Sequence, residues 1–145
     1  MSAAAARRTL DASTLMVMVV DDDYDARRIY SDYMRSKGLS VTTAADGRKA
    51  IQKANDLKPE VIVLDLAMPR VDGWTVLRNL RESSWTATIP IIVVSAVTDA
   101  RDEAFYAGCD AFLAKPCPPE VVWLQVLAMF RVAKTLRDIP PPSPT

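Results

Sequence analysis

Short apolar runs rich in valine and isoleucine alternate along the chain with segments of helical periodicity. A β-branched run followed by an amphipathic segment is typical of a βα unit, and repeated units of this kind build a parallel sheet. The predicted strands are 15–20, 40–44, 61–64, 91–94 and 110–114, and the predicted helices are 24–37, 47–56, 74–81, 99–107 and 118–136. The pattern therefore predicts an α/β fold, a doubly wound five-stranded parallel sheet with five helices.

Capping residues support these boundaries. Asp46 stands where the helix 47–56 needs an N-cap, Gly38 and Gly108 stand where helices should stop, and Pro119 suits a first helical turn. The stripe expected to face the core on helix 24–37 consists of Ala26, Ile29, Tyr30, Tyr33 and Met34.

The apolar runs end in reactive side chains. These are Asp21 and Asp22 after 15–20, Asp65 after 61–64, Ser95 after 91–94, and Lys115 after 110–114. The carboxyl ends of parallel strands share one edge of a sheet. In the strand order 2-1-3-4-5 the four strands that carry these residues are contiguous, so we expect the five side chains to share one pocket.

Three aspartates in one pocket repel one another unless a cation neutralises them. A ligand set of carboxylate oxygens, in a chain without histidine, favours Mg²⁺ over zinc. Lys115 adds a fixed positive charge. These groups suit an aspartate that attacks a phosphoryl group, and we take Asp65 as the nucleophile and Asp21 and Asp22 as the metal site.

Four segments, VVDDD (19–23), LDLAMPRVDG (64–73), VVSA (93–96) and AFLAKP (111–116), together resemble the receiver domain of bacterial two-component response regulators. The resemblance covers residues 14–137 and implies a flavodoxin-like fold. Residues 1–13 are then a flexible arm and residues 138–145 a Pro-rich tail. Because no output domain is expected after residue 137, the chain resembles the stand-alone, chemotaxis-regulator-like members.

The resemblance implies a role for each position of the pocket. Asp65 is the phosphoacceptor, and Mg²⁺ is held by Asp22 directly, by Asp21 through water and by the backbone carbonyl of Ala67. Ser95 is the switch hydroxyl, Lys115 the lysine that contacts the phosphoryl group, and Phe112 the aromatic rotamer switch. Family members usually hold the bond at Lys115–Pro116 in the cis form.

Two positions that tune phosphoryl hydrolysis in the family hold Ala67 and Val97. Small Ala67 leaves the pocket open, whereas apolar Val97 offers nothing to orient water. The two residues act in opposite directions, so the sequence does not set the phosphoryl lifetime.

The amino-acid composition limits the kinds of partner and compartment that we expect. Lysine and arginine number 18 and so do aspartate and glutamate, so no overall positive field favours nucleic acid. Cys109 and Cys117 are expected to be free thiols of a reducing compartment. No segment has the roughly 18 apolar residues needed to span a bilayer, and the N-terminal segment is a poor signal peptide. We expect a cytoplasmic protein without membrane contact.

These observations predict a signalling domain and not an enzyme. A histidine kinase or phosphotransfer protein would donate the phosphoryl group to Asp65, and a downstream protein target would read the changed surface. Two alternatives stay open: a phosphorylation-independent, receiver-like interaction module, and a hydrolase that uses an aspartyl-phosphate. The loop at Asp65 lacks the D-x-D-x-T pattern of such hydrolases.

The helix 118–136 is unusually apolar. Val122, Val126 and Met129 form one stripe, and beside it lies a second stripe of Trp123, Leu127 and Phe130. One apolar stripe suffices to cover a sheet, so the second indicates either deep burial or a contact with a partner, including a homodimer. Partial burial is expected for each tryptophan, at 74, 85 and 123.

Overall fold

The computed structural model describes residues 15–138, with side chains up to residue 132. Five parallel strands form one sheet in the order β2-β1-β3-β4-β5. They are β1 (Met16–Val20), β2 (Ser40–Ala44), β3 (Val61–Leu64), β4 (Ile91–Ser95) and β5 (Ala111–Ala114). The predicted strand order is confirmed. The predicted arm (1–13) and, apart from residue 138, the predicted tail lie outside the described residues.

Helices follow the strands as predicted, within about two residues at each end. They are α2 (Tyr24–Ser36), α3 (Gly47–Leu57), α4 (Gly73–Glu82), α5 (Arg101–Ala107), which a 3₁₀ turn (Thr98–Ala100) precedes, and α6 (Pro119–Asp138). Three aspartates begin helices: Asp23, Asp46 and Asp72 each accept a hydrogen bond from a backbone N–H of the first turn. This role explains part of the acidic run at 21–25.

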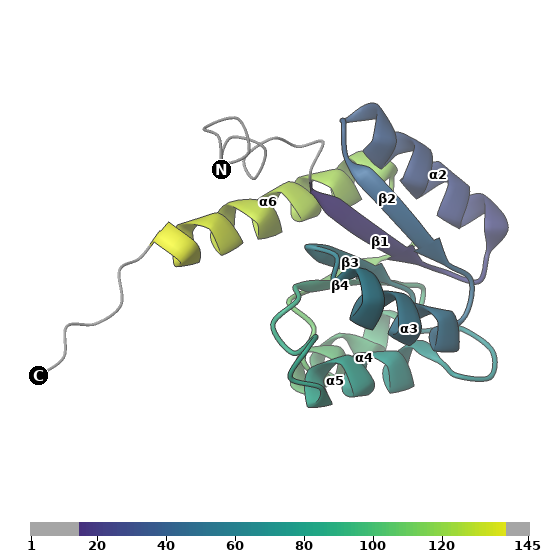
Figure 1. The fold of residues 1–145 in the computed structure, drawn as a ribbon. Helices are drawn as coiled ribbons and strands as arrows, with labels where there is room; N and C mark the ends of the chain where they lie inside the picture. Colours follow the sequence, from purple (N-terminus) through teal and green to yellow (C-terminus); the bar gives the residue numbers. More distant parts are fainter. Residues whose placement is uncertain (1–14, 139–145) are drawn as a thin grey trace, which may run out of the picture.

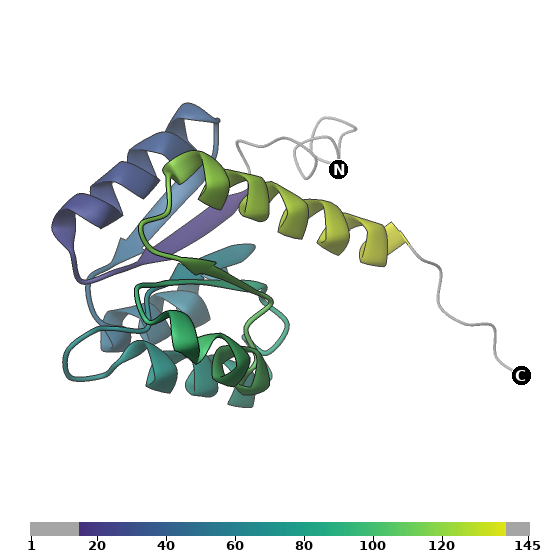
Figure 2. The same cartoon turned by 180° about the vertical axis from the view of Figure 1, so that it is seen from behind.

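Two layers of helices cover the sheet. α2 and α6 lie on one face, and α3, α4 and α5 lie on the other (Figure 1, and from behind in Figure 2). Successive residues of β1 point to opposite faces: Val17 and Val19 pack beneath α2 and α6, and Met18 and Val20 pack beneath the other helices. Every residue of β3 and β4 is buried, as expected for strands covered on both faces.

Two burial predictions are wrong. Ile29, predicted to face the core, is 55% exposed, whereas Tyr30, Ser31 and Met34 form the buried side of α2. The helix packs against β1, β2 and α6, whereas Ile29 lines a hollow beside Cys117 and Pro118 and stays open to solvent. Trp85, predicted to be partly buried, is 68% exposed, and its ring lies 4.2 Å from the Lys58 ammonium. That cation–π contact gives the ring a partner at the surface.

Helix α6 buries only part of its apolar surface. Val122 and Val126 are fully buried, and Met129 of the same stripe and Trp123 and Phe130 of the second stripe are half-buried against the same cluster. A third line of apolar residues along the helix is exposed to solvent and consists of Val121, Leu124 and Val132. The far end of the helix extends past the sheet (Figure 1). Across residues 15–138, no helix is long and apolar enough to cross a membrane.

Arg81 joins three segments at the edge of the sheet where the strands begin. Its guanidinium donates to the carbonyl oxygens of Gly108 at 2.8 Å, Ala87 at 3.1 Å and Ile89 at 2.7 Å, and it pairs with Asp110 at 2.8 Å. Asp110 also accepts a hydrogen bond from the backbone N–H of Ile91. The end of α4 is thereby tied to the segments that lead into β4 and β5.

Candidate functional site

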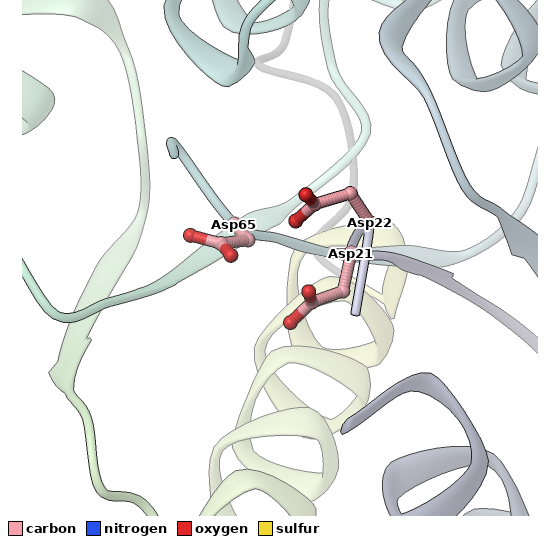
Figure 3. Close-up of side chains that lie close together, drawn as sticks. All are labelled: Asp21, Asp22 and Asp65. Carbon is pink, nitrogen blue, oxygen red and sulfur yellow. The ribbon is translucent and has the colours of Figure 1, made fainter. Parts of the chain in front are cut away.

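Three aspartates meet where β1 and β3 end. Asp21 and Asp22 follow β1 and Asp65 follows β3, and one carboxylate oxygen of each lies within 4.8 Å of the others (Figure 3). The backbone explains the convergence, because the N–H of Asp65 donates to the carbonyl of Val20 at 2.9 Å and so extends the strand pairing into the loop. Asp21 and Asp65 are buried, and Asp22 is exposed.

Lys115 reaches the same pocket from the end of β5. Its ammonium lies 2.8 Å from Asp21 Oδ2 and 3.2 Å from Asp65 Oδ2. The peptide bond between Lys115 and Pro116 is cis, as the resemblance implied. The ammonium therefore bridges the two buried carboxylates.

The pKa values in the pocket reflect burial and charge together. Burial raises the pKa of the Asp65 carboxyl, and the charge of Asp21 raises it further, against the opposing effects of the Ala67 N–H and the Lys115 ammonium. Burial alone would lower the pKa of Lys115, but its hydrogen bond to Asp21 and the charges of Asp21 and Asp65 outweigh this, so its pKa is raised. Lys115 is therefore a firmly protonated cation.

The loop after Asp65 holds the carboxylate in place. Asp65 Oδ1 accepts a hydrogen bond from the N–H of Ala67 at 3.1 Å. The N–H of Gly73, the first residue of α4, donates to the carbonyl of Leu66 at 3.1 Å. A Cβ atom at Gly73 would lie 2.3 Å from the carbonyl oxygen of Asp65, so only glycine allows α4 to begin this close to the acidic residue.

Ser95 is buried at the end of β4, and its Oγ accepts a hydrogen bond from the N–H of Val97 at 3.1 Å. Within residues 15–138, no hydrogen bond joins Ser95 to the aspartates. Val97 and Ala67 are both exposed. Phe112 of β5 is half-buried and packs against the cluster beneath α4 and α5.

The donor set suits a divalent cation. Among the residues that the structure describes, three carboxylates share this pocket with the Lys115 ammonium, and the donors that they offer are oxygen atoms only. Hard ions that keep part of their water shell, Mg²⁺ above all, prefer such donors. The exposed carboxylate of Asp22 leaves one side of the cluster open to solvent.

Sequence reasoning missed two contacts beside the pocket. Arg27 of α2 donates to the carbonyl oxygens of Asp21 at 2.8 Å and Asp22 at 3.2 Å, and so secures the loop that carries both aspartates. Tyr30 donates its hydroxyl proton to the carbonyl of Cys117 at 2.9 Å, beside a hollow of about 560 Å³ that Ile29 and Lys115 also line. All three acceptors are backbone carbonyl oxygens, which leave no mark in a sequence pattern.

Comparison with known proteins gives a consistent result. Residues 17–126 match the family model described as the response regulator receiver domain. The chain is 35% identical over 117 residues to the DNA-binding dual master transcriptional regulator RpaA of Synechocystis sp., a match that covers 79% of this chain and 48% of that protein. It is 36% identical over 132 residues to a protein-glutamate methylesterase/protein-glutamine glutaminase of Myxococcus xanthus. That match covers 85% of this chain and 37% of that protein. The chain thus spans about half, or less, of the length of these relatives.

Solved structures resemble the whole fold. The chemotaxis response regulator CheY4 of Vibrio cholerae superposes with a TM-score of 0.75 at 30% identity, covering 79% of this chain and 98% of that chain. The receiver domain of the Francisella response regulator 1452 superposes with a TM-score of 0.77 at 29% identity, covering 82% and 98%.

Proposed function

The chain belongs to the response regulator receiver domain family, whose members are signalling domains that interact with histidine kinases and effectors, and we propose that it is phosphorylated on Asp65. One observation supports this most strongly: Asp21, Asp22 and Asp65 lie within 4.8 Å of one another with the Lys115 ammonium between the two buried ones. A buried carboxylate beside a fixed cation and an open metal site suits attack on phosphorus.

In the proposed reaction a carboxylate oxygen of Asp65 forms a bond to phosphorus, and the bond from phosphorus to the histidine nitrogen of the donor breaks. The displaced imidazole keeps the electron pair of that bond and takes up a proton. Mg²⁺, when held by Asp21, Asp22, Asp65 and the Ala67 carbonyl, would offset the charge of the phosphoryl oxygens. Lys115 would exchange its contact with Asp65 for one with a phosphoryl oxygen.

Ser95 is positioned to report the phosphoryl group. Its Oγ accepts a hydrogen bond from the backbone N–H of Val97, which leaves its own hydroxyl hydrogen available to donate. If it donates to a phosphoryl oxygen, the loop after β4 is drawn toward Asp65. The half-buried ring of Phe112, on the neighbouring strand β5, would then repack. This would change the surface that α5 and α6 present to a downstream protein.

Other features of this function are also proposals. The balance of 18 basic and 18 acidic residues supports action through proteins without nucleic acid. We also propose that the protein works in the cytoplasm. We keep 14–137 as the extent of the domain and propose that it acts as a single domain. The exposed line on α6 supports a protein contact through this helix, for which we take a second copy of the chain as partner.

The test is incubation of the full chain with Mg²⁺ and acetyl phosphate, followed by intact mass measurement. Wild type should gain one phosphoryl group, and Asp65→Asn should gain none. Asp56→Asn, at an exposed position of α3, is the matched control and should be labelled like wild type. Wild type that stays unlabelled by acetyl phosphate and by kinases would favour the phosphorylation-independent interaction module, and label on Asp65→Asn would refute the site.

A further inference from the structure

A second hollow, of about 260 Å³, lies between α2 and the edge strand β2. It is smaller than the roughly 300–1,000 Å³ of pockets for drug-sized ligands, so it suits a small molecule or ion. Its lining is rich in positive charge: Tyr24, Arg27, Arg28, Ser31, Asp32, Arg35 and Thr43. Three guanidinium groups face one carboxylate, which leaves the hollow with a net positive charge.

Ser31 lines this hollow and is 2% exposed, and its Oγ has no hydrogen-bond partner within the described part of the chain. A serine within a helix can donate a hydrogen bond from its hydroxyl to the carbonyl oxygen four residues earlier, but Ser31 makes no such bond. A buried hydroxyl without a partner is unfavourable, and an acceptor bound in the adjoining hollow would satisfy it. This observation is independent of the charge of the arginines.

The arginines keep donors available. The hydrogen bonds of Arg27 to the backbone use one terminal nitrogen, and the carbon of its guanidinium lies 5.7 Å from the Tyr24 ring. Arg28 and Arg35 share Asp32 at 3.6 and 3.7 Å, and Arg35 also donates to the carbonyl oxygen of Val41 at 3.5 Å. The side chains of Arg28, Asp32 and Arg35 are each more than half exposed. Exposed pairs at such distances are weak. Because each guanidinium carries five N–H groups, these contacts leave most of them free.

We propose that this hollow binds the phosphate group of a small molecule, either inorganic phosphate or a small phosphomonoester. Guanidinium groups match phosphate oxygens in charge and geometry. The hydroxyls of Ser31 and Thr43 add neutral donors from the helix and the strand. Arg27 lines the hollow and also donates to the loop of Asp21 and Asp22, so one side chain would contact both the bound anion and that loop.

The test is an NMR titration of the full chain with inorganic phosphate, and separately with glycerol 3-phosphate, at constant ionic strength. EDTA excludes divalent metal, and the Asp65→Asn background removes the phosphoacceptor, so the result does not depend on phosphorylation. Saturable shifts are expected at the amides of Ser31, Arg35 and Thr43, with smaller ones at Asp22. Saturation by only one of the two compounds identifies the source of the phosphate group.

Variants separate a built site from general charge attraction. Changing Arg28 and Arg35 together to Gln should weaken binding at least about tenfold, the scale expected for lost hydrogen bonds to a charged group. Ser31→Ala should weaken it several-fold in a protein that melts at or above the wild-type temperature. Arg78→Gln, at an exposed position of α4, is the control and should bind normally. Non-saturable shifts, or equal affinity in the double variant and the control, would overturn the proposal.

Discussion

Lys115 neutralises only part of the charge of the two buried carboxylates that it contacts. The pKa of Asp65 stays raised, mainly through burial, even with this ammonium 3.2 Å away. A residue in this state makes folding less favourable when it is ionised. The pocket therefore reduces the stability of the domain to keep a reactive carboxylate in place.

Asp65→Asn should stabilise the metal-free protein at neutral pH. The raised pKa means that the folded state binds this proton more tightly than the unfolded state does. The stability from protonated Asp65 is present below the ordinary aspartate pKa of about 3.9 and is lost as pH rises through the folded-state pKa. Asn keeps the neutral form at every pH. Thermal melts should show a higher melting temperature for the variant than for wild type at pH 7, and this gain should vanish near pH 3.

Mg²⁺ provides the control for this prediction. Added to wild type, Mg²⁺ should offset the negative charge of the carboxylates and reduce the difference in melting temperature between wild type and Asp65→Asn. An Asn variant that melts below wild type at pH 7 without metal would show that the contact of Asp65 with Lys115 outweighs its burial.

Arg81 should be one of the most important residues for stability among the exposed and half-buried cations. Arg81→Met keeps much of the side-chain volume but removes the donor to three carbonyl oxygens and the cation that pairs with Asp110. We expect a loss of about 2–4 kcal/mol in the free energy of unfolding, measured by urea denaturation. Arg78→Met, on the exposed side of the same helix, should stay within about 0.5 kcal/mol of wild type. Equal losses in the two variants would contradict the role of the Arg81 hydrogen bonds.

At the level of elements, periodicity and capping residues were enough to predict all five strands, whereas their order was assumed from the doubly wound topology that places the reactive strand ends side by side. Residue types at strand ends also predicted the cluster of Asp21, Asp22, Asp65 and Lys115, because a parallel sheet brings those ends together. Periodicity cannot tell which stripe finds a neighbour, which is why Ile29 was placed in the core and Ser31 was not. Arg27 and Arg81 were missed because their acceptors are mostly backbone carbonyls.

For the whole molecule, the uncovered part of α6 predicts self-association. Leu124 is 63% exposed at the centre of the line with Val121 and Val132. If two copies pair through this line, sedimentation of wild type should depend on concentration, and Leu124→Glu should raise the dissociation constant by about tenfold or more. Tyr106→Glu is the control, because Tyr106 is 95% exposed on α5 and outside the line. Wild type that stays monomeric at high concentration would contradict self-association and would indicate that a different protein binds the exposed line on α6.

Gly73 also affects the electrostatics of the phosphorylated molecule. Because it has no side chain, the first turn of α4 lies against the backbone of Asp65. The amino end of a helix carries a partial positive charge from its aligned peptide dipoles, which favours nearby anions by about 0.3–1 kcal/mol and fades beyond the first turn. Phosphorylation of Asp65 would add negative charge close to that end. The close packing that Gly73 permits would then stabilise the modified form more than the unmodified one, without any movement of a side chain.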